Sequence, residues 1–445
     1  MPDSTRLNFR YLLTPEGWLR DQAIVVGTDG LIRALEPSTG PWDGTLAVPG
    51  VPNAHSHVFQ RALSGRGEAR RGEDSFWSWR EAMYGLAARV DAETLYAIAR
   101  QAYGEMLAAG FTSVAEFHYL HHGVDGAHGP ELAEAVVHAA EDAGIRLRLL
   151  PVLYQRGGFG QAPGVAQARF VHEKLDDFLR LLDALRAHEP GLAFHSLRAV
   201  APETLAATLE TVHAVLGHDI PVHVHIAEQR REVEDCLATT GKTPIAALFD
   251  AVSVDRHWSL IHATHASRTE LEAVASSGAA VVVCPLTEAY LGDGLFPGAQ
   301  YLGDGGSVAI GSDSNARIDA VEELRWLEYG QRLNDESRAR FSDANGLGVP
   351  LWQRACAGGA QALGLPVGSI APGQAADFVV LEPDAAPLLG HAPESWLDAL
   401  VIGGSRSDIG AVYVGGKRQV EGGEWTDRAS VASRYDAVVK NLLET

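Results

Sequence analysis

The sequence predicts an α/β protein: a (β/α)8 barrel with a small β domain formed by both chain ends. Apolar runs alternate with helix-like stretches through the middle of the chain, and eight of these runs have strand length. Eight strands separated by helices match the repeat of a (β/α)8 barrel. Both ends of the chain carry short β-runs with glycine turns instead. The chain has 445 residues, more than a single hydrophobic core usually supports, which favours a large domain with a smaller companion.

Residues 1–48 are predicted to form the N-terminal part of the small β domain. The segments LNFRYLLTPEGWLR and AIVVGTDGLIRALEP have the texture of short strands and turns. The sequence TDG lies between two alternating runs and is typical of a hairpin turn. We therefore expect an antiparallel pair of strands on either side of it.

Residues 49–365 are predicted to form the barrel. Two of the helix-like segments between its strands, at 131–144 and 268–278, end at a glycine, which is a common helix stop. The eight strands are expected within 45–57, 112–120, 145–154, 192–200, 220–228, 258–265, 279–286 and 307–314. Active sites of such barrels lie at the C-terminal ends of the strands, so reactive side chains are expected there.

The sequence pattern changes again after residue 365. Residues 366–425 are predicted to complete the small β domain, because VGSIAPGQAADFVVLEP and IGAVYVGGKRQVEGGEW combine short β-runs with glycine turns. Residues 426–445 are predicted to form a C-terminal helix.

Composition limits the class of partner. A net charge of −21 argues against nucleic acid or an anionic membrane surface, because like charges repel. A small anionic substrate would need local arginines to hold it. The three cysteines are far apart, which favours neither a disulfide framework nor a cysteine metal site. No run reaches membrane-spanning length and no signal-peptide core is evident, so a cytoplasmic protein is expected.

Four predicted strands end in groups that bind metal or move protons. The first strand ends in His55 and His57, which share one face of an extended segment. The fifth strand carries His225, followed by Glu228, and the other two carry His262 and Asp313. Imidazoles and a carboxylate suit a divalent ion such as zinc, with one position left for a water of lowered pKa. Because strand ends converge on one mouth of a barrel, we expect these groups to meet.

Several of these assignments have alternatives. His223 shares a face with His225, and His265 follows His262; we prefer His225 and His262 because they fit the strand ends better. Glu228 is also compatible with a solvated helix start, and Asp313 with a helix N-cap. The third and fourth strands contain no lysine that could bridge two metals, so one metal ion is expected.

Motifs along nearly the whole chain resemble the amidohydrolase superfamily, in its mononuclear zinc deaminase branch. They are PGVPNAHSH, HIAE, IHATH, GSDS and the closing GSIAPGQAADFVVLE. The resemblance implies one Zn²⁺ held by His55, His57, His225 and Asp313. It also implies that Glu228 and His262 handle protons, with Asp313 assisting at the reaction centre.

Further stretches, among them NAHSHVFQRA, DSFWSWREAMY and HSLRAVAPE, narrow the resemblance. This closer resemblance implies that the protein hydrolyses N-formimino-L-glutamate to N-formyl-L-glutamate and ammonia, a reaction of histidine degradation. It also implies a homodimer. The substrate would be held by Gln60, Arg80, Tyr119, His195 and Arg198. From spacing alone, Arg80 is equally compatible with a helix surface and Arg198 with a structural ion pair.

Three other functions remain open at this point. One is an aminohydrolase of the same branch that acts on guanine, cytosine or an adenosine derivative. The second is a ring-opening hydrolase that acts on imidazolonepropionate. The third is a non-catalytic metal-binding or interaction protein on a barrel.

Overall fold

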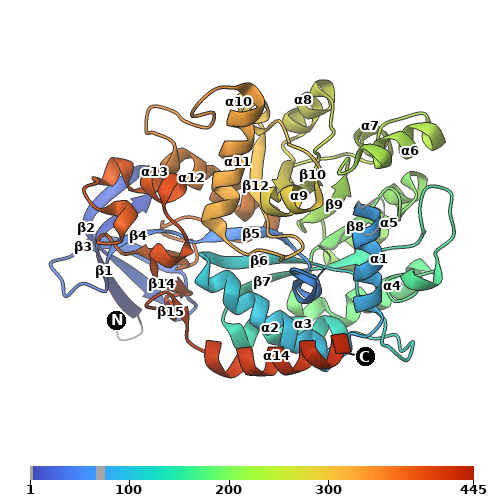
Figure 1. The fold of residues 1–445 in the computed structure, drawn as a ribbon, viewed down its shortest axis with the longest axis horizontal. Coiled ribbons are helices and arrows are strands. Elements are labelled where there is room, and N and C mark those ends of the chain that lie inside the picture. Colours follow the sequence, from blue (N-terminus) through green and yellow to red (C-terminus); the bar gives the residue numbers. More distant parts are fainter. Residues whose placement is uncertain (1–3, 67–75, 445) are drawn as a thin grey trace.

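The computed structural model describes residues 4–66 and 76–444 and contains two eight-stranded sheets. One sheet is parallel and curls into a barrel, in the order β12-β11-β10-β9-β8-β7-β6-β5. The other has the order β16-β15-β14-β13-β4-β1-β2-β3 and lies beside the barrel (Figure 1). The predicted fold class is therefore confirmed, whereas the domain boundaries at 48, 365 and 425 stay predictions.

The small sheet combines both ends of the chain. Its strands are β1 (Ser4–Thr14), β2 (Gly17–Gly27), β3 (Ile32–Pro37), β4 (Gly44–Pro49), β13 (Phe378–Leu381), β14 (Ile409–Val414), β15 (Lys417–Glu421) and β16 (Glu424–Trp425). Strands β2 and β3 pair antiparallel across the TDG turn, as predicted. The ends of the chain meet where β4 pairs with β13, and Phe9 packs edge-on against Phe378 in the core behind them.

The barrel strands occupy the eight predicted stretches. They are β5 (Val51–Ser56), β6 (Phe111–His118), β7 (Arg146–Leu153), β8 (Leu192–Ser196), β9 (Val222–Ile226), β10 (Trp258–His262), β11 (Ala280–Val283) and β12 (Ser307–Ile310). Nearly every residue of these strands is buried, as expected for a parallel sheet covered by helices.

One strand prediction was wrong. The run 45–57 was expected to be a single barrel strand, but it divides at Gly50 into β4 of the small sheet and β5 of the barrel. A Cβ atom at Gly50 would lie 2.3 Å from the Thr112 side chain. The glycine therefore allows the chain to pass tightly from one sheet to the other, a close approach that apolar periodicity does not reveal.

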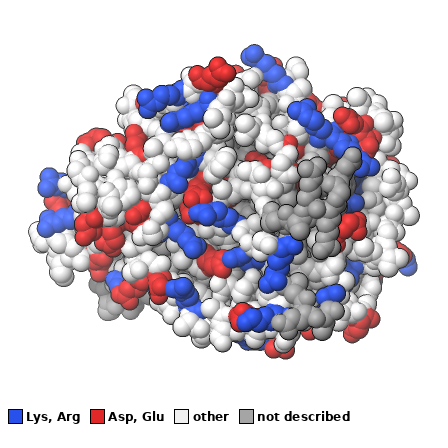
Figure 2. Space-filling model, in the orientation of Figure 1, with Lys and Arg blue, Asp and Glu red and all other residues white. Residues whose placement is uncertain are grey.

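Helices surround the barrel, and a long C-terminal helix lies against α2 (Figure 1). The helices are α1 (Phe76–Ala87), α2 (Ala92–Ala108), α3 (Glu131–Ala143), α4 (Leu175–Ala184), α5 (Pro202–Leu216), α6 (Arg230–Thr240), α7 (Pro244–Ala251), α8 (Arg268–Ser277), α9 (Pro285–Leu291), α10 (Gly298–Gly303), α11 (Ala320–Asp335), α12 (Gly348–Leu363), α13 (Pro393–Gly403) and α14 (Arg428–Glu444). Within the described residues, none of them is both long and apolar enough to cross a membrane. On the face shown in Figure 2, acidic and basic side chains are interspersed, so the negative net charge forms no uniform patch there.

Backbone hydrogen bonds join the first and last strands just beyond their ends. The carbonyl oxygen of His55 accepts hydrogen bonds from the backbone N–H groups of Ser312 and Asp313, at 3.1 and 2.9 Å. The N–H of His57 donates to the carbonyl of Asp313 at 2.9 Å. This closure fixes Asp313 beside the two histidines, although about 250 residues separate them in sequence.

Candidate metal and catalytic site

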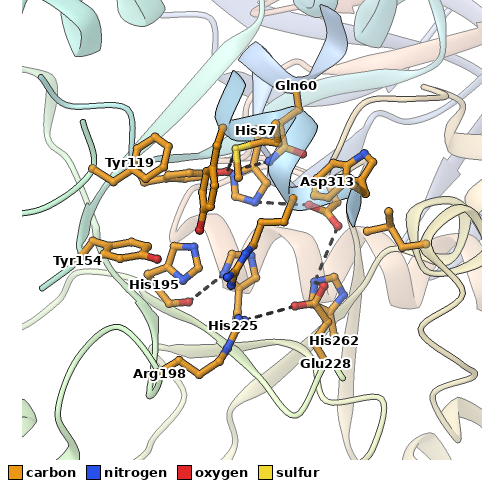
Figure 3. Close-up of a pocket in the computed structure, with 16 residues that line it drawn as sticks. His57, Gln60, Tyr119, Tyr154, His195, Arg198, His225, Glu228, His262 and Asp313 are labelled. Carbon is orange, nitrogen blue, oxygen red and sulfur yellow. Dashed lines mark hydrogen bonds and ion pairs between the residues drawn. The ribbon is translucent and has the colours of Figure 1, made fainter. Parts of the chain in front are cut away.

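His55, His57 and His225 meet at the C-terminal mouth of the barrel, and Figure 3 shows His57 and His225 there. The Nδ1 of His57 donates to the carbonyl of Phe117, and the Nδ1 of His225 donates to the carbonyl of His195, both at 2.9 Å. Because a carbonyl only accepts, each Nε2 is left with a lone pair. The Nε2 atoms of His225 and His55 lie 3.0 Å apart. A backbone carbonyl behind each imidazole is the usual support of a metal ligand.

Asp313 completes this group. Its Oδ1 lies 3.5 Å from Nε2 of His55 and 3.4 Å from Nε2 of His57. Burial raises the pKa of Asp313, but the neighbouring imidazoles outweigh burial and hold this pKa below its ordinary value. Its φ of 46° is left-handed, which costs a non-glycine residue energy and is common at functional sites. The following helix, α11, is capped by Asp319 instead, so Asp313 is not a helix cap.

The residues fit a divalent cation. Among the described residues, two groups bring three ligand atoms within 4.8 Å of one another: His55, His57 and His225, and His55, His262 and Asp313. Burial lowers the pKa of His55, His57 and His225, to about 3 for His55, so these three imidazoles are neutral and able to coordinate near pH 7. Neutral imidazoles with one carboxylate are ligands that zinc accepts.

His262 lies at the end of β10, also in the left-handed region, with a φ of 70°. Its Nε2 is 3.9 Å from Oε1 of Glu228 and 3.8 Å from Oδ2 of Asp313, while its Nδ1 is 3.2 Å from Oε1 of Glu288. Burial lowers the pKa of His262, but these three carboxylates outweigh burial and raise it to about 10. His262 is therefore positioned to donate hydrogen bonds.

Glu228 lies just beyond β9, with its side chain in the cavity. Burial raises the pKa of Glu228 to about 7, which is a favourable value for an acid or base that works at neutral pH. Its backbone N–H donates to Oε2 of Glu232 at 3.0 Å, which fixes the turn into α6. Its Oε2 lies 3.7 Å from the guanidinium of Arg198.

The residues predicted to bind substrate line the same cavity, which encloses about 560 Å³ including its opening to solvent. Gln60, on a 3-10 turn (Val58–Leu63), donates to the hydroxyl of Tyr119 at 2.8 Å. The ring centroids of His195 and Tyr154 lie 4.5 Å apart, and burial lowers the pKa of His195 well below the ordinary value, so His195 is neutral.

Two cations reach the cavity, Arg80 from α1 and Arg198 from the end of β8. Of all the predicted site residues, His55 alone lies behind the cavity wall.

The competing histidines point elsewhere. His223 is buried, and its Nε2 lies 2.8 Å from the carbonyl of Ala362. The Nε2 of His265 lies 2.9 Å from the carbonyl of Asp293. Neither of them lines the cavity or belongs to the ligand groups.

Two kinds of residue at the site were not predicted from the sequence. Two buried carboxylates, Glu232 and Glu288, support the predicted proton-handling groups from behind. Both follow barrel strands by a few residues, and that position was the only signal that could have found them. The other kind is the apolar and aromatic wall of the cavity: Trp79, Met83, Tyr84, Tyr154, Phe170 and Leu291.

The barrel and its ligand cluster are those of a metal-dependent hydrolase. The model of the amidohydrolase family matches residues 46–418, and the chain belongs to that family. It is 44% identical to the formimidoylglutamate deiminase of Pseudomonas aeruginosa, over 97% of this chain and 98% of that protein. It is 29% identical to a 5-methylthioadenosine/S-adenosylhomocysteine deaminase of Natronomonas pharaonis, over 92% and 91% of the two chains. The crystal structure of an amidohydrolase from Brucella melitensis superposes with a TM-score of 0.91 at 39% identity, covering 98% and 99% of the two chains.

Proposed function

We propose that this protein hydrolyses N-formimino-L-glutamate to N-formyl-L-glutamate and ammonia, using one zinc ion. The observation that carries the proposal is the presence of Arg80 and Arg198 in the same cavity as the histidine cluster. The substrate has two carboxylates, and arginine binds a carboxylate through two parallel hydrogen bonds. The 44% identity to a formimidoylglutamate deiminase supports the same substrate.

His55, His57, His225 and Asp313 would hold the metal. When bound, a divalent ion there supplies a water of lowered pKa and polarises the substrate. The carbonyls behind His57 and His225 keep the rings in place, so the protein determines where that chemistry occurs.

Glu228 is assigned the proton transfers. It accepts a proton from the attacking water and gives it to the nitrogen that leaves as ammonia. Burial raises the pKa of Glu228 to about 7, so that its carboxyl group can both accept and release a proton near neutral pH. His262 donates a hydrogen bond at the reaction centre, and Asp313 helps to orient the water.

The remaining cavity residues orient the substrate. Gln60 holds the formimino group in line, while Tyr119 and His195 form the adjoining wall. Arg80 and Arg198 bind the carboxylates. A homodimeric assembly, a cytoplasmic location and a role in histidine degradation stay predictions of the family resemblance.

Ammonia release tests the proposal. Zinc-loaded protein is offered N-formimino-L-glutamate beside guanine, cytosine and S-adenosylhomocysteine. Fast release from N-formimino-L-glutamate alone supports the proposal. Release from a nucleobase or nucleoside would overturn the substrate assignment, and no release from any of them would favour a non-catalytic role.

A nucleoside deaminase is the second candidate, favoured by the 29% identity to a deaminase of adenosine derivatives. Such substrates are aromatic and lack paired carboxylates. Arg198→Met separates the two candidates. A large rise in the KM for N-formimino-L-glutamate supports the first candidate, whereas an unchanged KM for a nucleoside substrate supports the second.

A further inference from the structure

Arg198 lies between two carboxylates. Its terminal nitrogen is 3.7 Å from Oε2 of Glu228, and its Nε is 3.8 Å from Oε1 of Glu232. The Arg198 side chain is 11% exposed and Glu232 is fully buried, so solvent screens these charges little. The residue assigned to bind substrate is thus also an ion-pair partner of the residue assigned to move protons.

The two ion pairs are loose. Charge-assisted N–H···O bonds usually measure about 2.7–2.9 Å, and the contacts of Arg198 with Glu228 and Glu232 are both longer. A guanidinium held at such distances gains by exchanging one partner for a carboxylate that offers two parallel hydrogen bonds. An incoming substrate carboxylate can offer this.

Of the two carboxylates beside Arg198, Glu232 is the one held in place. It has no solvent exposure, and its Oε2 accepts the backbone N–H of Glu228. A ligand in the cavity can reach Glu228, because the side chain of Glu228 lines the cavity beside His262. Exchange at Arg198 therefore releases Glu228 rather than Glu232.

We propose that the substrate's carboxylate displaces Glu228 from Arg198 and thereby frees Glu228 for proton transfer, while Glu232 retains the guanidinium. The inference rests on the proposed function and deepens it. As long as Arg198 holds Oε2 of Glu228, that oxygen is drawn away from the leaving nitrogen. A substrate without the carboxylate leaves Glu228 restrained, so specificity appears in kcat as well as in KM.

The test uses N-methylformamidine, which keeps the reacting group and has no carboxylate. Zinc-loaded Arg198→Met is expected to release ammonia from it about fivefold faster than the wild type, because Glu228 is no longer restrained. The same variant loses activity on N-formimino-L-glutamate. A residue that only binds substrate would not raise turnover of the truncated substrate.

Glu232→Gln provides a second test that keeps the guanidinium and the side-chain shape. With one carboxylate partner removed, Arg198 binds Glu228 more tightly, so turnover of N-methylformamidine should fall about threefold or more. The control is Arg231→Met, an exposed arginine on the same helix that pairs with Asp235 and should leave both rates unchanged.

The two variants should thus change the rate in opposite directions, which a merely structural role would not produce. An Arg198→Met rate at or below the wild type overturns the inference, including the case in which neither protein shows turnover. A Glu232→Gln rate that is unchanged or raised also overturns it. If the wild type fails on N-formimino-L-glutamate itself, the proposed function has failed instead.

Discussion

The Nδ1 of His262 lies 3.2 Å from Oε1 of Glu288, and the same carboxylate oxygen accepts the backbone N–H of Cys284 at 2.9 Å. Glu288 is therefore held by the end of β11 and in turn holds the ring of His262. The contact places the Nδ1 hydrogen toward Glu288 and leaves Nε2 toward Glu228 and Asp313. A carboxylate behind a reactive imidazole sets its orientation.

Glu288→Gln should lower kcat about 10- to 100-fold, because an amide no longer favours one orientation and charge state of His262. Zinc content should stay near that of the wild type, since Glu288 is not in either ligand group. Steady-state kinetics and metal analysis of the purified variant check this. Wild-type kcat in Glu288→Gln would remove the positioning role.

The matched control is Glu328→Gln. Glu328 is also buried but lies on α11 outside the cavity, where it accepts the backbone N–H groups of Arg340 and Phe341. Its replacement should lower stability and leave kcat unchanged. A similar loss of kcat in both variants would indicate a general effect of removing a buried carboxylate.

Glu228→Gln should keep its zinc and lose most turnover, about 100-fold or more, because glutamine cannot accept a proton. The structure supports separate roles, since Glu228 contacts His262 and Arg198 but belongs to no ligand group. Metal content and ammonia release measured on the same sample distinguish the two. Near-wild-type turnover would exclude the proton shuttle.

His225→Asn and His265→Asn form a matched pair for the metal site. His225 is in the ligand cluster, whereas His265 lies outside the cavity and contacts Asp293. Elemental analysis should show loss of zinc only in His225→Asn, and a chelator should inactivate wild type and His265→Asn alike until zinc is restored. Zinc retained in His225→Asn would contradict the assigned ligand set.

Hydrogen bonds to Asp377, at the opposite end of the barrel, are expected to stabilise the fold. Arg146 of β7 donates two hydrogen bonds to the buried carboxylate of Asp377, at 2.8 and 3.0 Å, and Gly415 donates a third at 2.7 Å. These bonds connect the barrel to the small sheet. Asp377→Asn should lower the free energy of unfolding by about 2 kcal/mol, measured in urea. The exposed Glu272→Gln should leave the unfolding midpoint unchanged, and equal midpoints in both variants would argue against this connection.

The fold could be predicted because parallel strands are buried on both faces and helices separate them, so the alternation is visible in sequence. The grouping of His55, His225 and Asp313 could also be predicted, since strand ends converge in a barrel whatever their separation along the chain. The rest depended on contacts that no local pattern carries. Gly50 divides a strand because Thr112 packs against it, from a strand about 60 residues away.

The supporting residues show the same limit. Glu288 lies 26 residues from His262, and apart from its place a few residues after a barrel strand, nothing in the sequence distinguishes it from other helix glutamates. Asn53 donates to Ser312 at 2.6 Å across 259 residues and so helps to hold the segment that carries Asp313. Such contacts follow from the register of closed strands, which sequence periodicity does not specify.

The proposed reaction is defined by which C–N bond of the substrate is broken. Proton NMR of N-formimino-L-glutamate with zinc-loaded protein identifies the products directly, alongside an assay for ammonia. We predict N-formyl-L-glutamate and ammonia in equal amounts, and no products once zinc is removed. Formamide with free L-glutamate would show that the other C–N bond breaks, and an unchanged spectrum would show that this is not the substrate; either result would contradict the account.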